Sequence, residues 1–169
     1  MKIKNTIFYV LSVVICFLLQ TSVFEFLKLN DVMPNILLIL TVSFAIIKGK
    51  SVGMGIGFAC GLLIDIFSGD VMGQYALLYV IIGFVNGYFH EYFYEDEVLL
   101  PIALLVANSF IYSLLIFTFF FVLRGRINLL AYLKVVIIPE AVYTGVLALP
   151  IFYVISIVNY RMKLSEKRS

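Results

Sequence analysis

In residues 53–65, Gly-Met-Gly-Ile-Gly-Phe-Ala-Cys-Gly-Leu-Leu-Ile-Asp, small residues recur at intervals of four and lead to a carboxylate: Gly53, Gly57, Gly61 and Asp65. Residues four apart share one face of an α-helix. Two overlapping Gly-x-x-x-Gly motifs on that face let another helix backbone approach closely, as helices do in lipid. The stretch therefore predicts a membrane-spanning helix with a close-packing face. The surface that packs against this face is either the Gly83-x-x-x-Gly87 motif of the same chain or a partner protein.

The composition of the whole chain extends this interpretation. Of its 169 residues, 63% are hydrophobic and 13% are charged, whereas a soluble domain has roughly 45–50% apolar and about 25% charged residues. A spanning helix needs about 20 residues, so six spans would use nearly the whole length. The predicted fold class is all-α, a polytopic integral membrane protein with one transmembrane domain over residues 1–169. The expected spans are residues 5–24, 34–47, 51–68, 72–89, 98–123 and 139–158.

The last apolar segment, residues 128–158, is too long for one straight span. Its 31 residues would make a helix of about 46 Å, whereas the hydrocarbon core is about 30 Å thick. Proline suits the first turn of a helix, and a carboxylate is favoured there. Pro139-Glu140 is therefore expected to begin the sixth span, as Pro34-Asn35 begins the second. Pro150 falls inside the sixth span and predicts a kink.

Basic residues set the expected orientation, because Lys and Arg are enriched in cytoplasmic loops. With six spans the two termini share one side of the membrane. Eight basic residues fall on that side and four on the other, which predicts that both termini are cytoplasmic. The first set is Lys2, Lys4, Lys48, Lys50, Arg161, Lys163, Lys167 and Arg168, and the second is Lys28, Arg124, Arg126 and Lys134.

Three polar side chains, Gln20, Asp65 and Glu140, fall near the outer ends of their expected spans. Ionisable groups within spans are costly and usually face the protein interior or water. One interpretation is a polar cluster that opens outward and holds an assembly contact or an internal ion pair. The alternative is that each carboxylate is separately solvated at the headgroup level.

Few residues are available for catalysis or for binding a metal or cofactor, so none of these is expected. The single histidine, His90, lies in an acidic loop at residues 90–97, and Cys16 and Cys60 lie singly in apolar runs. A hydrolase using the two carboxylates Asp65 and Glu140 stays conceivable, since such chemistry needs only two acids with separated pKa values. The basic run at residues 161–168 suits anionic lipid rather than nucleic acid.

Three sequence elements together resemble the MreD family of bacterial rod-shape-determining membrane proteins. They are Pro34-Asn35 with the apolar run that follows, the central Gly57-Phe58-x-x-Gly61-Leu62-Leu63-x-Asp65, and Pro139-Glu140-x-x-Tyr143 ahead of Leu149-Pro150. The resemblance covers essentially the whole chain. The residues that it carries over are Pro34, Asn35, Gly57, Phe58, Gly61, Asp65, Pro139 and Glu140.

The resemblance implies a non-enzymatic role in cell-wall elongation at the bacterial inner membrane. The implied partner is an MreC-like single-span protein, and through it the filament MreB, a SEDS-type glycosyltransferase and a class B penicillin-binding protein. The implied fold is like that of the six-helix S-component of energy-coupling-factor importers. A substrate-binding S-component of a vitamin importer is therefore the main alternative, and a small channel or flippase-like protein is a third.

Overall fold

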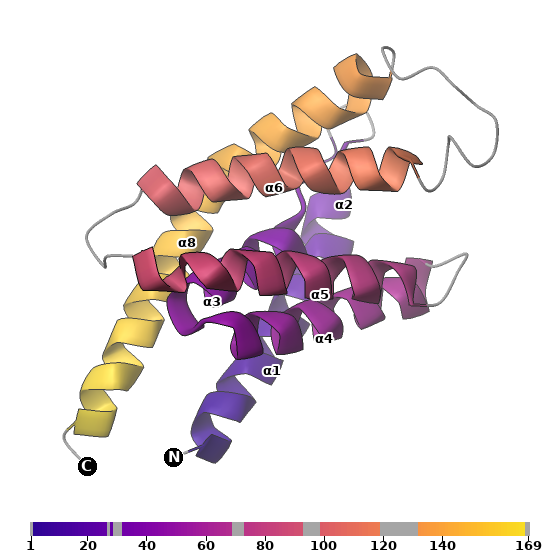
Figure 1. The fold of residues 1–169 in the computed structure, drawn as a ribbon. Helices are drawn as coiled ribbons and strands as arrows, with labels where there is room; N and C mark the ends of the chain where they lie inside the picture. The colour runs from indigo at the N-terminus through magenta and orange to yellow at the C-terminus, as the bar shows by residue number, and fades with distance from the viewer. Residues whose placement is uncertain are drawn as a thin grey trace.

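The computed structural model describes residues 2–26, 28, 32–68, 73–92, 99–118 and 132–167. All the elements within these ranges are helical (Figure 1), which confirms the predicted all-α class for the described part of the chain. The elements are α1 (Lys2–Leu18), the π-helical turn η1 (Leu19–Val23), α2 (Phe24–Phe26), α3 (Ile36–Lys48), α4 (Lys50–Ser68), α5 (Gln74–Asn86), the 3-10 turn η2 (Gly87–Tyr92), α6 (Leu99–Phe117), the π-helical turn η4 (Leu133–Ile137) and α8 (Ile138–Lys167).

The helix α3 forms the centre of the bundle. Its residues from Ile36 to Ile47 are all buried, and it contacts α1, α4, α5, α6 and α8. A helix that is apolar on every side belongs in such a core. The Asn35 side chain caps its start by accepting from the Leu38 N–H at 3.0 Å, and Gly49 ends it at a φ of 87°. At 13 residues, α3 is about 20 Å long.

Among the described residues, four helical segments are long and apolar enough to cross a membrane: Thr6–Phe26, Lys50–Phe67, Leu99–Phe117 and Leu133–Arg161. These helices fit a multi-pass membrane protein. The helices α3 and α5 have 13 residues each, which is shorter than a bilayer core normally requires. Six crossings stay a prediction, and the predicted end of the fifth span at residue 123 lies outside the described residues.

The last apolar segment is one continuous helix across Pro139, so the predicted helix start at this residue is wrong. The turn η4 leads directly into α8, with the Ile138 N–H bonded to the Leu133 carbonyl. In a regular α-helix a proline ring clashes with the carbonyl four residues earlier. The π-helical turn widens the backbone directly before Pro139 and relieves that clash. The segment's expected beginning near residue 128 lies outside the described residues.

The start of α1 and the end of α8 lie on the same side of the molecule (Figure 1). On the way to the C-terminus, α8 changes direction part-way along its length (Figure 1), and Pro150 is the proline inside it. The first helix is the most peripheral of the long ones. Only 6% of the most apolar window of Thr6–Phe26 is buried, against 28% to 33% in the other three candidate spans. Most of its apolar surface is therefore available to lipid or to a partner.

Candidate functional site

A cavity of about 220 Å³ lies at the N-terminal end of α3. Its polar lining comes from four elements far apart in the sequence: Gln20 in η1, Asn35 before α3, Tyr112 in α6 and Glu140 in α8. The apolar lining consists of Val32, Met33, Pro34 and Val136. Of the residues predicted from the sequence, Gln20, Pro34, Asn35 and Glu140 thus meet at one place.

Side chains from three other elements hold the start of α3. The Gln20 side chain accepts from the Leu37 N–H at 3.1 Å, and the Thr144 hydroxyl accepts from the Asn35 N–H at 3.1 Å. The Tyr79 hydroxyl donates to the Asn35 side chain at 2.8 Å. The first N–H groups of a helix have no partner within the helix, and these contacts satisfy them in the interior. The start of α3, where the cavity lies, is therefore held by side chains from η1, α5 and α8.

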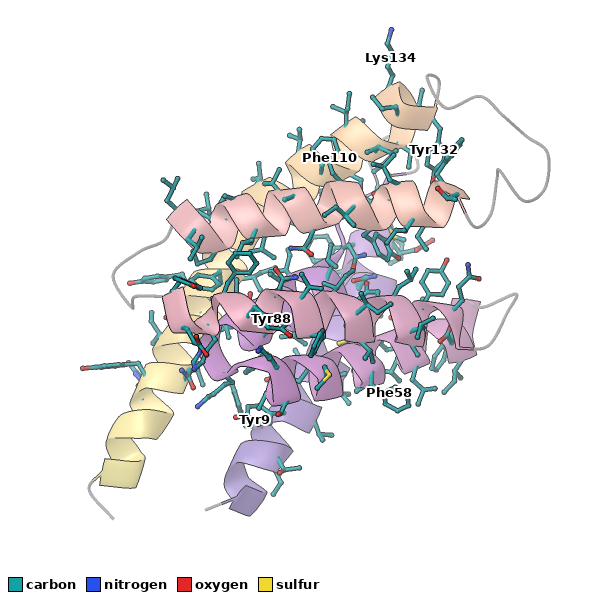
Figure 2. All side chains as sticks on the ribbon, viewed as in Figure 1. Tyr9, Phe58, Tyr88, Phe110, Tyr132 and Lys134 are labelled. Atoms are coloured by element: carbon teal, nitrogen blue, oxygen red, sulfur yellow. The ribbon has the colours of Figure 1, made fainter. Side chains whose placement is uncertain are left out.

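Glu140 is the one carboxylate in the described lining of the cavity. Its Oε2 accepts from the Ser113 hydroxyl at 2.8 Å. In the described part of the chain no lysine or arginine forms an ion pair with it, and the ion pair that is present joins Lys28 to Glu25. The Lys134 side chain points away from the bundle at the far end of η4 (Figure 2). The cavity therefore presents a carboxylate without a nearby basic side chain from the same described residues.

Asp65 has a different role from Glu140, and it does not line the cavity. Its two oxygens accept from the backbone N–H groups of Tyr75 at 3.0 Å and Ala76 at 2.9 Å. These N–H groups belong to the first turn of α5, where a carboxylate satisfies unpaired donors and complements the helix dipole. The expectation of one cluster containing Gln20, Asp65 and Glu140 is therefore wrong for Asp65. Two residues at similar depth in different spans can still face different neighbours, because depth does not determine lateral position.

The glycine face of α4 packs against α5 of the same chain. A Cβ added at Gly57 would overlap the Tyr79 carbonyl, and one at Gly61 would overlap the Ala76 backbone. A Cβ at Gly53 would lie 2.6 Å from the Ala45 Cβ and 2.8 Å from the Gly83 carbonyl oxygen. This face is therefore occupied within the chain. Phe58, by contrast, is exposed and points outward from α4 (Figure 2).

Asn86 and Asn108 form a second polar contact that sequence reasoning missed. Each side-chain amide donates to the other's oxygen at 2.8 Å, which links α5 to α6. Both are nearly inaccessible, and they also donate to the carbonyls of Ile82 and Leu104. Tyr112, which lines the cavity, was missed as well, and so were Ser113 and Thr144, which bond to the lining residues Glu140 and Asn35. The only signal for any of them is a polar residue within an apolar run.

These features fit a multi-pass helical membrane protein whose short central helix begins at a small cavity lined by both polar and apolar side chains. A family model described as rod shape-determining protein MreD matches residues 1–161. The chain belongs to the MreD family, and the resemblance inferred from the sequence is confirmed. No curated protein matches the chain, and no solved structure does.

Proposed function

We propose that this chain is a non-enzymatic membrane component of the bacterial cell-wall elongation complex, where it maintains rod shape by binding an MreC-like single-span protein. The family match over residues 1–161 carries this proposal, because the family is one of rod-shape-determining membrane proteins. Through the MreC-like partner the chain connects to MreB, a SEDS-type glycosyltransferase and a class B penicillin-binding protein.

The placement of the acids supports a binding role over hydrolysis. Two-carboxylate chemistry needs both acids beside the bond that is broken. Here both oxygens of Asp65 are bonded to the first turn of α5, and Asp65 is absent from the cavity that Glu140 lines. A single carboxylate beside neutral side chains suits recognition of a partner group.

We further propose six crossings, with α3 and the α5–η2 segment as the two short ones, in an arrangement like that of an S-component. Both termini then face the cytoplasm, in keeping with the distribution of basic residues. The cavity at the start of α3 opens toward the outer side of the bacterial inner membrane, where an MreC-like protein has its extracytoplasmic domain.

The volume of the cavity argues against the importer alternative. Pockets for drug-sized ligands have volumes of about 300–1,000 Å³, whereas this one measures about 220 Å³. A drug-sized vitamin would need a larger pocket than this one. A small channel or flippase has no observation of its own in its favour.

Co-purification with an MreC-like protein tests the proposal. The full chain with an affinity tag, expressed in place of the chromosomal copy, is expected to retain rod shape and to bring the MreC-like protein through detergent extraction. A tagged six-helix importer subunit of similar size serves as control. Round cells together with no MreC-like protein in the eluate would contradict the proposal. Native mass spectrometry that found a bound vitamin-sized molecule would favour the importer.

A further inference from the structure

The Glu140 carboxylate has no basic partner among the described residues. It lines a cavity, it accepts one side-chain hydrogen bond from Ser113, and no described basic side chain pairs with it. Ionisable groups within spans usually pair with one another or face water. A cationic group that the described residues do not supply is therefore the natural counter-charge.

The start of α3 stabilises a negative charge beside it, but its N–H groups are not bonded to the Glu140 carboxylate. The N-terminus of a helix carries the positive end of the helix dipole, and Asn35 at this end shares the cavity with Glu140. However, the N–H groups of Asn35, Leu37 and Leu38 are already bonded to Thr144, Gln20 and the Asn35 side chain. The carboxylate thus keeps an acceptor oxygen for an incoming donor.

We propose that this cavity binds one protonated amine or guanidinium group, with Glu140 as its counter-charge. The rest of the lining fits the same chemistry. The apolar side chains Val32, Met33 and Val136 suit the alkyl stem on which such a group is carried. The Tyr112 ring, which also lines the cavity, belongs to the aromatic type that attracts cations.

The volume limits the size of the bound group. At roughly 30 Å³ for each water molecule, a cavity of about 220 Å³ holds one long side chain or one small amine. The favoured source is a lysine or arginine side chain of the partner protein, and this choice of source rests on the proposed function. A free small amine is the other source of the same chemistry, and the two arms of the experiment distinguish them.

The first arm uses the purified full chain alone, in detergent, and n-butylammonium chloride as the probe. Thermal unfolding is followed by circular dichroism, with 1-butanol and sodium chloride at matched concentrations as controls. At a concentration about ten times its dissociation constant, n-butylammonium is expected to raise the Tm by about 3 °C. The controls are expected to leave the Tm unchanged. Glu140→Gln should abolish the rise, and Glu25→Gln, which changes an exposed carboxylate, should keep it.

The second arm measures co-purification of a full-length MreC-like protein with wild type, Glu140→Gln and Glu25→Gln. The cation comes from the partner if two results are obtained. Glu140→Gln, but not Glu25→Gln, lowers recovery of the MreC-like protein at least several-fold, and n-butylammonium lowers the recovery obtained with wild type. If amine binding is present but recovery is unchanged, the cation is a free amine. If n-butylammonium and sodium act alike on wild type, the inference is wrong, even where Glu140→Gln fails to fold. Whether the wild-type chain recovers the MreC-like protein at all tests the proposed function separately.

Discussion

The Asp65 side chain and the Ala76 backbone are joined by a hydrogen bond of 2.9 Å that closes the corner between α4 and α5. The same carboxylate also accepts from the Tyr75 N–H. The next small residue toward the start of α4, Gly61, lies directly against the Ala76 backbone. The carboxylate and the glycine face therefore act together, since the close approach that the glycines permit brings the first turn of α5 within reach of Asp65.

Replacing Asp65 should lower the stability of the fold. Asp65→Ala leaves two backbone donors without their acceptor in a buried place, which costs about 1–3 kcal/mol. Asp65→Asn keeps one acceptor oxygen, so a smaller loss is expected. Chemical or thermal unfolding of the purified variants in detergent measures both. Glu25→Gln is the control. An Asp65→Asn variant with unchanged stability that no longer recovers an MreC-like protein would show an assembly contact in place of the cap.

The glycines of α4 offer a matched comparison within one helix. Gly57→Leu and Gly61→Leu insert a side chain where the α5 backbone already lies, and overpacking costs typically 1–3 kcal/mol, occasionally more. Gly55 is exposed, and nothing lies within 4 Å of a Cβ added there, so Gly55→Leu should be tolerated. Membrane levels and size-exclusion profiles of the three variants check this. Equal behaviour of Gly55→Leu and Gly57→Leu would contradict the close packing seen here.

The sequence could predict the helical class and the residues of the glycine motif, because composition and spacing along one helix are local properties. It could not predict which acids meet. Asp65 and Glu140 lie at similar expected depths, yet Asp65 caps α5 and Glu140 lines the cavity. Depth along a span says nothing of the neighbour that it faces. The continuous helix through Pro139 escaped prediction for another reason, since the π-helical turn before it has no sequence signature.

Reporter fusions should place both ends of the chain in the cytoplasm. The two ends lie on one side of the molecule (Figure 1), and the basic residues assigned to that side outnumber the others by eight to four. An alkaline phosphatase fusion after Arg168 is expected to be inactive, and one after Asp70 active. A green fluorescent protein fusion should give the opposite pattern. An active phosphatase after Arg168 would reverse the orientation and place the cavity on the cytoplasmic side.

The Asn86–Asn108 pair should be energetically coupled, and a double-mutant cycle can measure the coupling. Each side chain donates to the other, so truncating one leaves its partner buried with unmet hydrogen bonds, at about 1–3 kcal/mol. Truncating both removes that penalty. Asn86→Ala with Asn108→Ala should therefore cost less than the sum of the single changes, by about 0.6 kcal/mol and at most about 1.7 kcal/mol, the average and the maximum coupling measured for polar pairs between membrane helices. Unfolding of the four proteins in mixed detergent gives this difference.

Ser12→Ala combined with Asn86→Ala serves as control, because the Ser12 hydroxyl bonds only within its own helix and its loss should add independently. A strictly additive Asn86/Asn108 cycle would mean that the two amides do not support each other in the folded protein.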